Sequence, residues 1–174
     1  MKTLQILICI TFIFAFSSAA FGQKAKIPAG NFSAVAMDGN TVELESLKGK
    51  VVVLTFWSTR CAICHSEIPK LNRLAEKYHD KNVVFLGITM DNDAKVSAYL
   101  QKNPFKFNIL PNSFGVFFQY ADKDTKGNMR MGFPAHFLIN QNGEVEIKSS
   151  GFDKTEQLNA GISRLLNSNL AKAE

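Results

Sequence analysis

The sequence contains little cysteine. Only three cysteines occur in 174 residues, at positions 9, 61 and 64. A secreted domain that depends on disulfides for its stability would carry several cysteines far apart in sequence. Cys61 and Cys64 are three residues apart, and a bridge between them would close a loop too short to stabilise the fold much through chain entropy. We therefore predict that this pair of cysteines takes part in a reaction rather than stabilising the fold.

Long runs of like charge are also missing. The formal net charge is +5, yet no block of five or more like charges occurs, and no array of basic and aromatic residues indicates a nucleic-acid partner. No internal repeat is present, and the length suits one domain of ordinary size. With 46% hydrophobic and 20% charged residues, the chain has the composition of a packed globular protein.

The N-terminal 22 residues have the layout of a secretory signal peptide. A short positive start, Met1-Lys2, is followed by an apolar run from Leu4 to Phe16 and then by small residues up to Gly22. The run is short for a membrane span. Cleavage fits after Ala20 or after Gly22, and either would remove the first cysteine. We therefore predict residues 1–22 as a signal peptide and an exported, periplasmic location, with an uncleaved membrane anchor as the alternative.

After a polar linker at residues 23–31, the pattern of apolar residues predicts one domain over residues 32–174. Phe32–Leu44 is expected to form a β-hairpin around Asp38-Gly39-Asn40. The apolar, β-branched runs Val51–Phe56 and Val83–Ile88 are expected to be buried strands. Further elements are predicted as a helical turn at Glu45–Lys50, strands at Phe107–Leu110, Ala135–Ile139 and Glu144–Lys148, helices at Asp93–Lys102, Asn112–Tyr120 and Lys154–Leu166, and an exposed loop at Ala121–Gly127. This alternation predicts an α/β fold with a central mixed β-sheet flanked by helices and the hairpin as an N-terminal extension.

Another helix is predicted directly after the two cysteines. Its apolar face is expected to consist of Cys64, Ile68, Leu71, Ala75 and Tyr78, which recur at helical spacing. The rest of its surface is expected to carry the charged residues Glu67, Lys70, Arg73 and Lys77. Pro69 lies inside this pattern and is expected to kink the helix.

The stretch Trp57-Ser-Thr-Arg-Cys61-Ala-Ile-Cys64-His65 fits two kinds of site. Cys-x-x-Cys-His is the spacing of covalent haem attachment, and Cys-x-x-Cys is the spacing of a redox-active dithiol. Here the pair follows a buried strand and opens a helix, whose positive N-terminus stabilises a thiolate. The first thiol is then exposed, while the second is shielded and close enough to bond with it. This asymmetry suits thiol–disulfide exchange, with Cys61 as nucleophile and Cys64 as resolving thiol.

Two separate motifs resemble the thioredoxin family. The strand Val51–Phe56, Trp57, the two cysteines and Pro69 resemble its active site, and the stretch Gly132-Phe-Pro-Ala-His-Phe-Leu-Ile-Asn140 resembles the loop before its penultimate strand. The hairpin, the signal peptide and Leu47–Leu54 narrow the resemblance to the exported TlpA/ResA-like branch, which includes the reductases of cytochrome c maturation. The resemblance covers roughly residues 30–167. It implies a thioredoxin fold and a thiol:disulfide oxidoreductase, preferably a reductase, with no cofactor beyond its own redox-active disulfide.

The resemblance also implies partners and a substrate-binding loop. Disulfide-bearing proteins are the expected substrates, and a membrane-bound or periplasmic protein is the expected electron donor. Pro134 is expected beside the dithiol with a cis bond to Phe133, whose backbone would pair with an incoming extended peptide. Trp57 is expected to shield the site and to pack beside Cys61.

Three further positions near the dithiol are candidates for tuning it. Arg60 stands where the branch commonly has an aromatic residue, and its guanidinium would depress the pKa of Cys61. The resemblance also implies an acidic residue after the second core strand that accepts the proton of the buried thiol. Asp91 stands nearest that place, and Asp93 is its rival.

Other functions stay open at this point. A haem site would need a second apolar shell, and a metal site built from Cys61, Cys64, His65 and His136 lacks a second clear ligand pair. A thiol peroxidase of the peroxiredoxin type would have threonine at Ser58 and proline at Leu54. A binding module with an inert disulfide is the alternative from a different class of protein.

Overall fold

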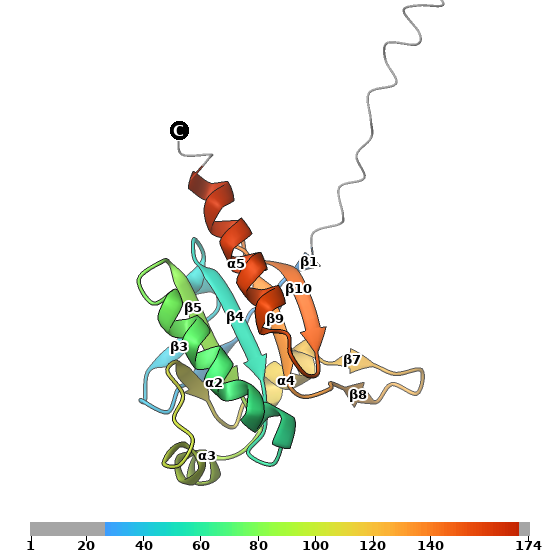
Figure 1. The fold of residues 1–174 in the computed structure, drawn as a ribbon. Helices are drawn as coiled ribbons and strands as arrows, with labels where there is room; N and C mark the ends of the chain where they lie inside the picture. The colour runs from blue at the N-terminus through green and yellow to red at the C-terminus, as the bar shows by residue number, and fades with distance from the viewer. Residues whose placement is uncertain (1–26, 171–174) are drawn as a thin grey trace, which may run out of the picture.

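The computed structural model describes residues 27–170, so the predicted signal peptide lies outside the described residues. A six-stranded sheet forms the centre of the described chain (Figure 1). In spatial order its strands are β1 (Ile27–Pro28), β10 (Glu144–Ser150), β9 (Ala135–Ile139), β4 (Val51–Phe56), β5 (Val83–Ile88) and β6 (Asn108–Leu110). The neighbours β4, β5 and β6 are parallel, whereas β9 runs antiparallel to both β4 and β10. The prediction of a central mixed sheet is confirmed.

Helices and a hairpin cover the two faces of this sheet. On one face lie α2 (Ala62–Lys77) and α5 (Thr155–Leu170), which run side by side (Figure 1). The other face is covered by α4 (Phe114–Tyr120) and by the hairpin of β2 (Ser33–Val35) and β3 (Thr41–Glu43). The remaining helices are α3 (Asp93–Leu100) and the 3₁₀ turn η1 (Glu45–Leu47). Within residues 27–170, no helix combines the length and the apolar character needed to cross a bilayer.

β4 is buried on both faces because each of its residues is apolar or β-branched. Val52, Leu54 and Phe56 pack in the core under α4, whereas Val51 and Val53 pack in the core under α2 and α5. Because β4 packs on both sides, its last residue, Phe56, is held at the centre of the sheet. The residues after Phe56 therefore emerge between the two layers, at the edge of the sheet formed by the carboxyl ends of its parallel strands.

Residues Ile27 and Pro28, which lie in the segment predicted as a linker, form the edge strand β1. They pair with Val145 and Glu144 of β10. A proline is compatible with this position, because the outer side of an edge strand needs no N–H donor. Its pairing partner β10 lies more than a hundred residues away in sequence, so no local sequence pattern predicts this strand.

The segment Ala121–Gly127, predicted as an exposed loop, contains a short strand, although the two residues of that strand are exposed. β7 (Asp122–Lys123) pairs with β8 (Met129–Arg130) in a separate two-stranded hairpin. The side chain of Asp124 holds the turn, since its carboxylate accepts hydrogen bonds from the backbone N–H groups of Lys126 and Asn128, both at 2.9 Å. Polar turn residues thus support a hairpin in a segment whose composition alone suggests a loop.

Candidate redox site

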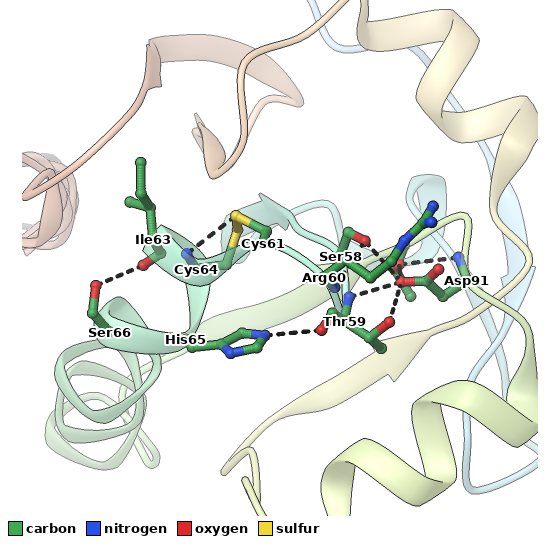
Figure 2. The surroundings of a disulfide bond; sticks show 10 residues. Ser58, Thr59, Arg60, Cys61, Ile63, Cys64, His65, Ser66 and Asp91 are labelled. Carbon is green, nitrogen blue, oxygen red and sulfur yellow. Dashed lines mark hydrogen bonds between the residues drawn. A yellow bond between two sulfur atoms is a disulfide. The ribbon is translucent and has the colours of Figure 1, made fainter.

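The two cysteines lie where β4 passes into α2. Cys61 is the N-cap residue of α2, and the backbone N–H of Cys64 donates a hydrogen bond to its sulfur at 3.1 Å. The two sulfurs form a disulfide, with 5.2 Å between the Cα atoms (Figure 2). Cys61 is half-buried, whereas only 2% of Cys64 is exposed. The predicted difference in exposure is confirmed.

The N-cap position stabilises negative charge on the sulfur of Cys61 when the disulfide is reduced. The N–H groups in the first turn of a helix have no acceptor inside the helix and carry the positive end of its dipole. One of them, that of Cys64, already points at the sulfur of Cys61. A thiolate at this place accepts a charge-assisted hydrogen bond, which is the condition for a reactive cysteine.

Asp91 anchors the loop that presents Cys61. Its Oδ2 accepts hydrogen bonds from the hydroxyl of Ser58 at 3.0 Å and from the backbone N–H and hydroxyl of Thr59 at 2.7 and 3.0 Å (Figure 2). Burial acts to raise the pKa of Asp91, but the hydrogen bonds from Thr59 and Ser58 and the charge of Lys95 lower it overall. Asp91 therefore stays ionised and ties the loop after β4 to the loop after β5.

The hydrogen-bond partners of the two candidate aspartates are not the sulfurs. Those of Asp91 belong to the loop and to Thr89, and Asp93 is exposed at the start of α3 and accepts a hydrogen bond from Asn112 at 2.8 Å. The structure thus gives Asp91 a positioning role. None of the contacts of Asp91 supports the proton-accepting role that the sequence analysis predicts for it.

The loop before β9 reaches the dithiol because β9 runs opposite to β4. Ala135 pairs with Phe56, so Pro134 comes one position further along the ladder, beside Trp57. The bond between Phe133 and Pro134 is cis, which confirms the expectation drawn from the resemblance. Phe133 packs in the same apolar cluster as both cysteines. Two stretches about seventy residues apart in sequence therefore meet at one site.

Trp57 and Arg60 differ in how closely they approach the dithiol. Trp57 is 1% exposed and packs with Cys64, with its ring 4.7 Å from that of Phe105 and 5.2 Å from that of Tyr99. It shields the inner side of the site, as predicted. Arg60 is exposed, and Figure 2 shows its guanidinium extending away from the two sulfurs.

The prediction that Glu67 lies on the polar surface of the helix was wrong. Glu67 is fully buried, one turn of α2 beyond Cys64. Its Oε1 lies 3.5 Å from the Nζ of Lys70, and its Oε2 has no hydrogen-bond partner. Lys70 in turn pairs with Asp153, in the loop between β10 and α5, at 2.7 Å. The spacing of three residues from Cys64, on the same side of the helix, was the signal available in the sequence.

His136 is a second buried ionisable residue near this end of the sheet. It is 0% exposed on β9, and its Nδ1 lies 3.1 Å from the hydroxyl of Thr55 on β4, while its Nε2 has no partner. Burial lowers its pKa to about 4. His65, by contrast, is exposed on α2 and donates from Nε2 to the carbonyl of Thr59 at 3.0 Å. Residues 27–170 contain no cluster of three His, Cys, Asp or Glu side chains arranged to hold a metal ion.

This arrangement is that of a thioredoxin-fold thiol:disulfide oxidoreductase, the class of protein that the sequence predicts. The comparisons agree with it. Residues 22–163 match the Redoxin family, and the chain belongs to that family.

Relatives with a described activity support the same class. A thiol-disulfide oxidoreductase ResA of Bacillus cereus is 30% identical over 168 residues, which cover 92% of this chain and 91% of the relative. ResA of Bacillus thuringiensis (strain Al Hakam) is 31% identical, with 87% of each chain covered. The fold matches a solved thiol:disulfide interchange protein of the thioredoxin family from Chlorobium tepidum TLS with a TM-score of 0.70, over 83% of this chain and 99% of that one, at 24% identity. The prediction of an oxidoreductase from the TlpA/ResA-like branch is confirmed.

Proposed function

We propose that this protein is an exported reductase of protein disulfides. The observation that carries the proposal is the unequal exposure of the two sulfurs at the start of α2. A half-exposed Cys61 can meet a substrate disulfide, whereas a covered Cys64 can meet only Cys61. The resemblance to the TlpA/ResA-like branch supports the reducing direction, an exported location and substrates that include the cysteines of c-type cytochromes before haem attachment.

The exchange proceeds in two displacements. The Cys61 thiolate attacks one sulfur of the substrate disulfide, a new bond forms between protein and substrate, and the other substrate sulfur leaves as a thiolate. The Cys64 thiolate then attacks the sulfur of Cys61 and releases the second substrate thiol. The protein ends as the Cys61–Cys64 disulfide, the form seen here, and the substrate has gained two electrons and two protons. A membrane-bound or periplasmic dithiol protein would restore the reduced form.

Glu67 is the group best placed to take the proton of Cys64. Cys64 must lose its proton before it attacks, and water reaches it poorly because it is 2% exposed. The unpartnered Oε2 of Glu67, one helical turn away and also buried, supplies an acceptor within the protein. This assignment gives to Glu67 the role that the sequence suggested for Asp91.

Insulin reduction tests the proposed function. The reduced protein should precipitate insulin B chain in the presence of a chemical reductant, and Cys61→Ala should abolish this activity. Cys64→Ala should instead accumulate a mixed disulfide with insulin, because the first displacement occurs and the second cannot. A wild-type protein that leaves insulin intact, or a Cys61→Ala variant with full activity, would contradict the proposal.

Alkylation at controlled pH tests the roles of the two thiols. In the reduced protein, iodoacetamide should modify Cys61 rapidly below pH 7 while Cys64 stays protected, because only Cys61 is both half-exposed and at the helix N-cap. Mass spectrometry of the digested protein reads out each site. Slow and equal modification of both cysteines would count against the assigned roles.

A further inference from the structure

Three buried side-chain atoms on neighbouring elements have no hydrogen-bond partner. They are Oε2 of Glu67 on α2, Nε2 of His136 on β9 and Oγ of Ser149 on β10. Buried side-chain polar atoms nearly always have a partner, because an unpaired one loses its contact with water and gains nothing in return. Three of them at one place therefore point to a small polar ligand that they share.

The sheet places His136 and Ser149 side by side on the face that α2 covers. Thr55 of β4, His136 and Ser149 are direct partners across three strands, so their side chains leave the sheet on the same side. We call these three residues the polar row. The residues two positions further from the dithiol along each strand are apolar and pack in the core under α2 and α5, namely Val53, Leu138 and Ile147. The polar row is therefore the end of this core nearest the dithiol.

Glu67 lies over the polar row from the helix side. Leu71, one turn further along α2, packs in the core under the helix, so Glu67 lies one turn nearer the dithiol, at the level of the polar row. The ion pair of Lys70 with Asp153 ties this turn of the helix to the loop after β10. Glu67 itself lies 3.5 Å from Lys70, which places it over the β9 and β10 members of the row.

The charged groups around this layer leave Oε2 of Glu67 to neutral partners. Lys70 lies near the other carboxylate oxygen, Oε1, and is drawn outward by Asp153 at 2.7 Å. Lys148 of β10 points to the opposite face of the sheet, and α5 contributes apolar side chains to this one. Cys64 is the remaining titratable group on this side of α2.

We propose that Glu67, His136 and Ser149 bind one buried water, through which the neutral imidazole keeps the carboxylate ionised until the resolving thiol releases its proton. The proposal rests on the proposed function, because it deepens the proton-accepting role given there to Glu67. Three polar partners are typical of a buried water. His136 is a positioning residue here, since it acts on Cys64 through Glu67.

The hydrogen bonds of this arrangement are complete. The hydroxyl of Thr55, 3.1 Å from Nδ1 of His136, donates to that nitrogen, so Nε2 carries the proton. Burial lowers the pKa of His136 to about 4, so the ring is neutral near pH 7. Nε2–H donates to the water oxygen, and the water donates one hydrogen to Oε2 of Glu67 and the other to Oγ of Ser149.

The second displacement then needs no further reagent. Cys64 gives its proton to the carboxylate of Glu67, and its thiolate attacks the sulfur of Cys61 in the mixed disulfide. The bond between Cys61 and the substrate breaks, and the leaving substrate thiolate takes a proton from solvent. Glu67 returns its proton to solvent once the product has left.

Stopped-flow reaction of the reduced protein with 5,5′-dithiobis(2-nitrobenzoate) separates the two displacements. Attack by Cys61 releases one coloured thiolate at a rate that depends on reagent concentration, and attack by Cys64 releases the second at a rate that does not. His136→Leu removes the donor to the water, and the carboxylate loses a hydrogen bond that favours its charged form. The pH midpoint of the second phase should then rise by about one unit, so this phase slows about tenfold below the midpoint. The first phase should change less than about twofold.

Further variants separate hydrogen bonding from packing. His136→Gln keeps an N–H donor in place of Nε2–H and should keep the midpoint of the wild type, although it removes the ring. Ser149→Ala leaves the water with fewer partners and should raise the midpoint by a smaller amount. Leu138→Val is the matched control, because it loosens the same core on the same strand without touching a polar group, and it should leave the midpoint unchanged.

Infrared difference spectra of the reduced protein give a readout that needs no turnover. The carbonyl band of a protonated carboxylic acid, assigned by its loss in Glu67→Gln, should appear at a higher pH in His136→Leu than in the wild type. A crystal structure of the wild type should show one water within hydrogen-bonding distance of Glu67, His136 and Ser149.

Each outcome separates the proposals. An unchanged midpoint in His136→Leu, an equal shift in Leu138→Val or His136→Gln, or a crystal structure without the water overturns the role of His136. If His136→Leu does not fold, an unchanged midpoint in Ser149→Ala overturns it as well. A second phase that is as fast in Glu67→Gln as in the wild type overturns the assignment of Glu67, and a wild-type protein that shows neither phase overturns the proposed function itself.

Discussion

Cys61 and Cys64 acquire different properties from one local event, the start of a helix between them. Cys61 lies outside the first turn and caps it, while Cys64 lies inside it and faces the core. Sequence spacing therefore suffices to predict both residues and the difference between them. The sequence does not predict that Glu67 and His136 are buried, because polar side chains give no apolar signal and tertiary packing encloses them. Lys70 lies between Glu67 and Asp153 and pairs with both, and the pairing of β9 between β4 and β10 encloses His136.

Burial of His136 should make the stability of the protein depend on pH. Its pKa is about 4 in the folded protein and near 6.5 in the unfolded chain. Between these values the unfolded chain binds a proton that the folded protein does not bind. The free energy of unfolding should therefore fall as the pH is lowered from 6.5 to 4.5, by about 2 to 3 kcal/mol from this residue.

Urea denaturation at several pH values measures this dependence. In His136→Gln the contribution should vanish, whereas His79→Gln, which replaces an exposed histidine, should keep the slope of the wild type. The slope with pH is the relevant readout, because His136→Gln also changes the core at every pH. Identical slopes in His136→Gln and wild type would show that His136 is not neutral and buried in the folded state.

At the scale of elements, apolar periodicity and turn residues predict the strands that are buried on both faces. β4, β5 and β9 begin and end at the predicted residues, since continuous apolar runs define them. The sequence does not predict β1, β7 and β8, which are two residues long and depend on partners rather than on pattern. α5 extends to Leu170, four residues past its predicted end, because no glycine or proline stops it.

The close contact between α5 and the sheet makes one helical glycine sensitive to substitution. A Cβ atom at Gly161 would lie 2.6 Å from Leu138 Cδ2 and 2.7 Å from Ile147 Cδ1, and Leu138 is fully buried. Gly161→Ala should therefore destabilise the protein by about 1 to 2 kcal/mol, although alanine is the better helix former.

Gly115 provides the matched control on α4. A Cβ atom there would meet no other atom within 4 Å, so Gly115→Ala should stabilise the protein by about 0.5 to 1 kcal/mol. Urea midpoints of both variants under identical conditions give the comparison. Equal stabilisation by the two substitutions would mean that α5 does not pack against β9 and β10 as closely as described.

At the scale of the whole molecule, the two main cores share one strand. β4 contributes alternate residues to the cluster under α4 and to the cluster under α2 and α5, so neither core can be exposed without disturbing the other. Unfolding should consequently be a single transition. The fluorescence of Trp57, the one tryptophan in the sequence, and far-UV circular dichroism should give the same midpoint in urea.

Two distinguishable midpoints would argue against this coupling. Trp57 lies at the dithiol end of the sheet, packed with Cys64, so an earlier fluorescence change would mean that the redox end opens before the rest of the fold. Recording the same curves for the reduced protein would serve as the control for quenching of the indole by the disulfide.

The β7–β8 hairpin has a consequence for how partner choice can diverge among related chains. Its two strands leave and re-enter the body as neighbours, because Asp122 pairs with Arg130. Lengthening, shortening or replacing the segment between them leaves the sheet and both cysteines in place. Since residues of this hairpin and Phe133 line the same hollow, insertions between the two strands can reshape the surface near the dithiol while the two cysteines stay unchanged.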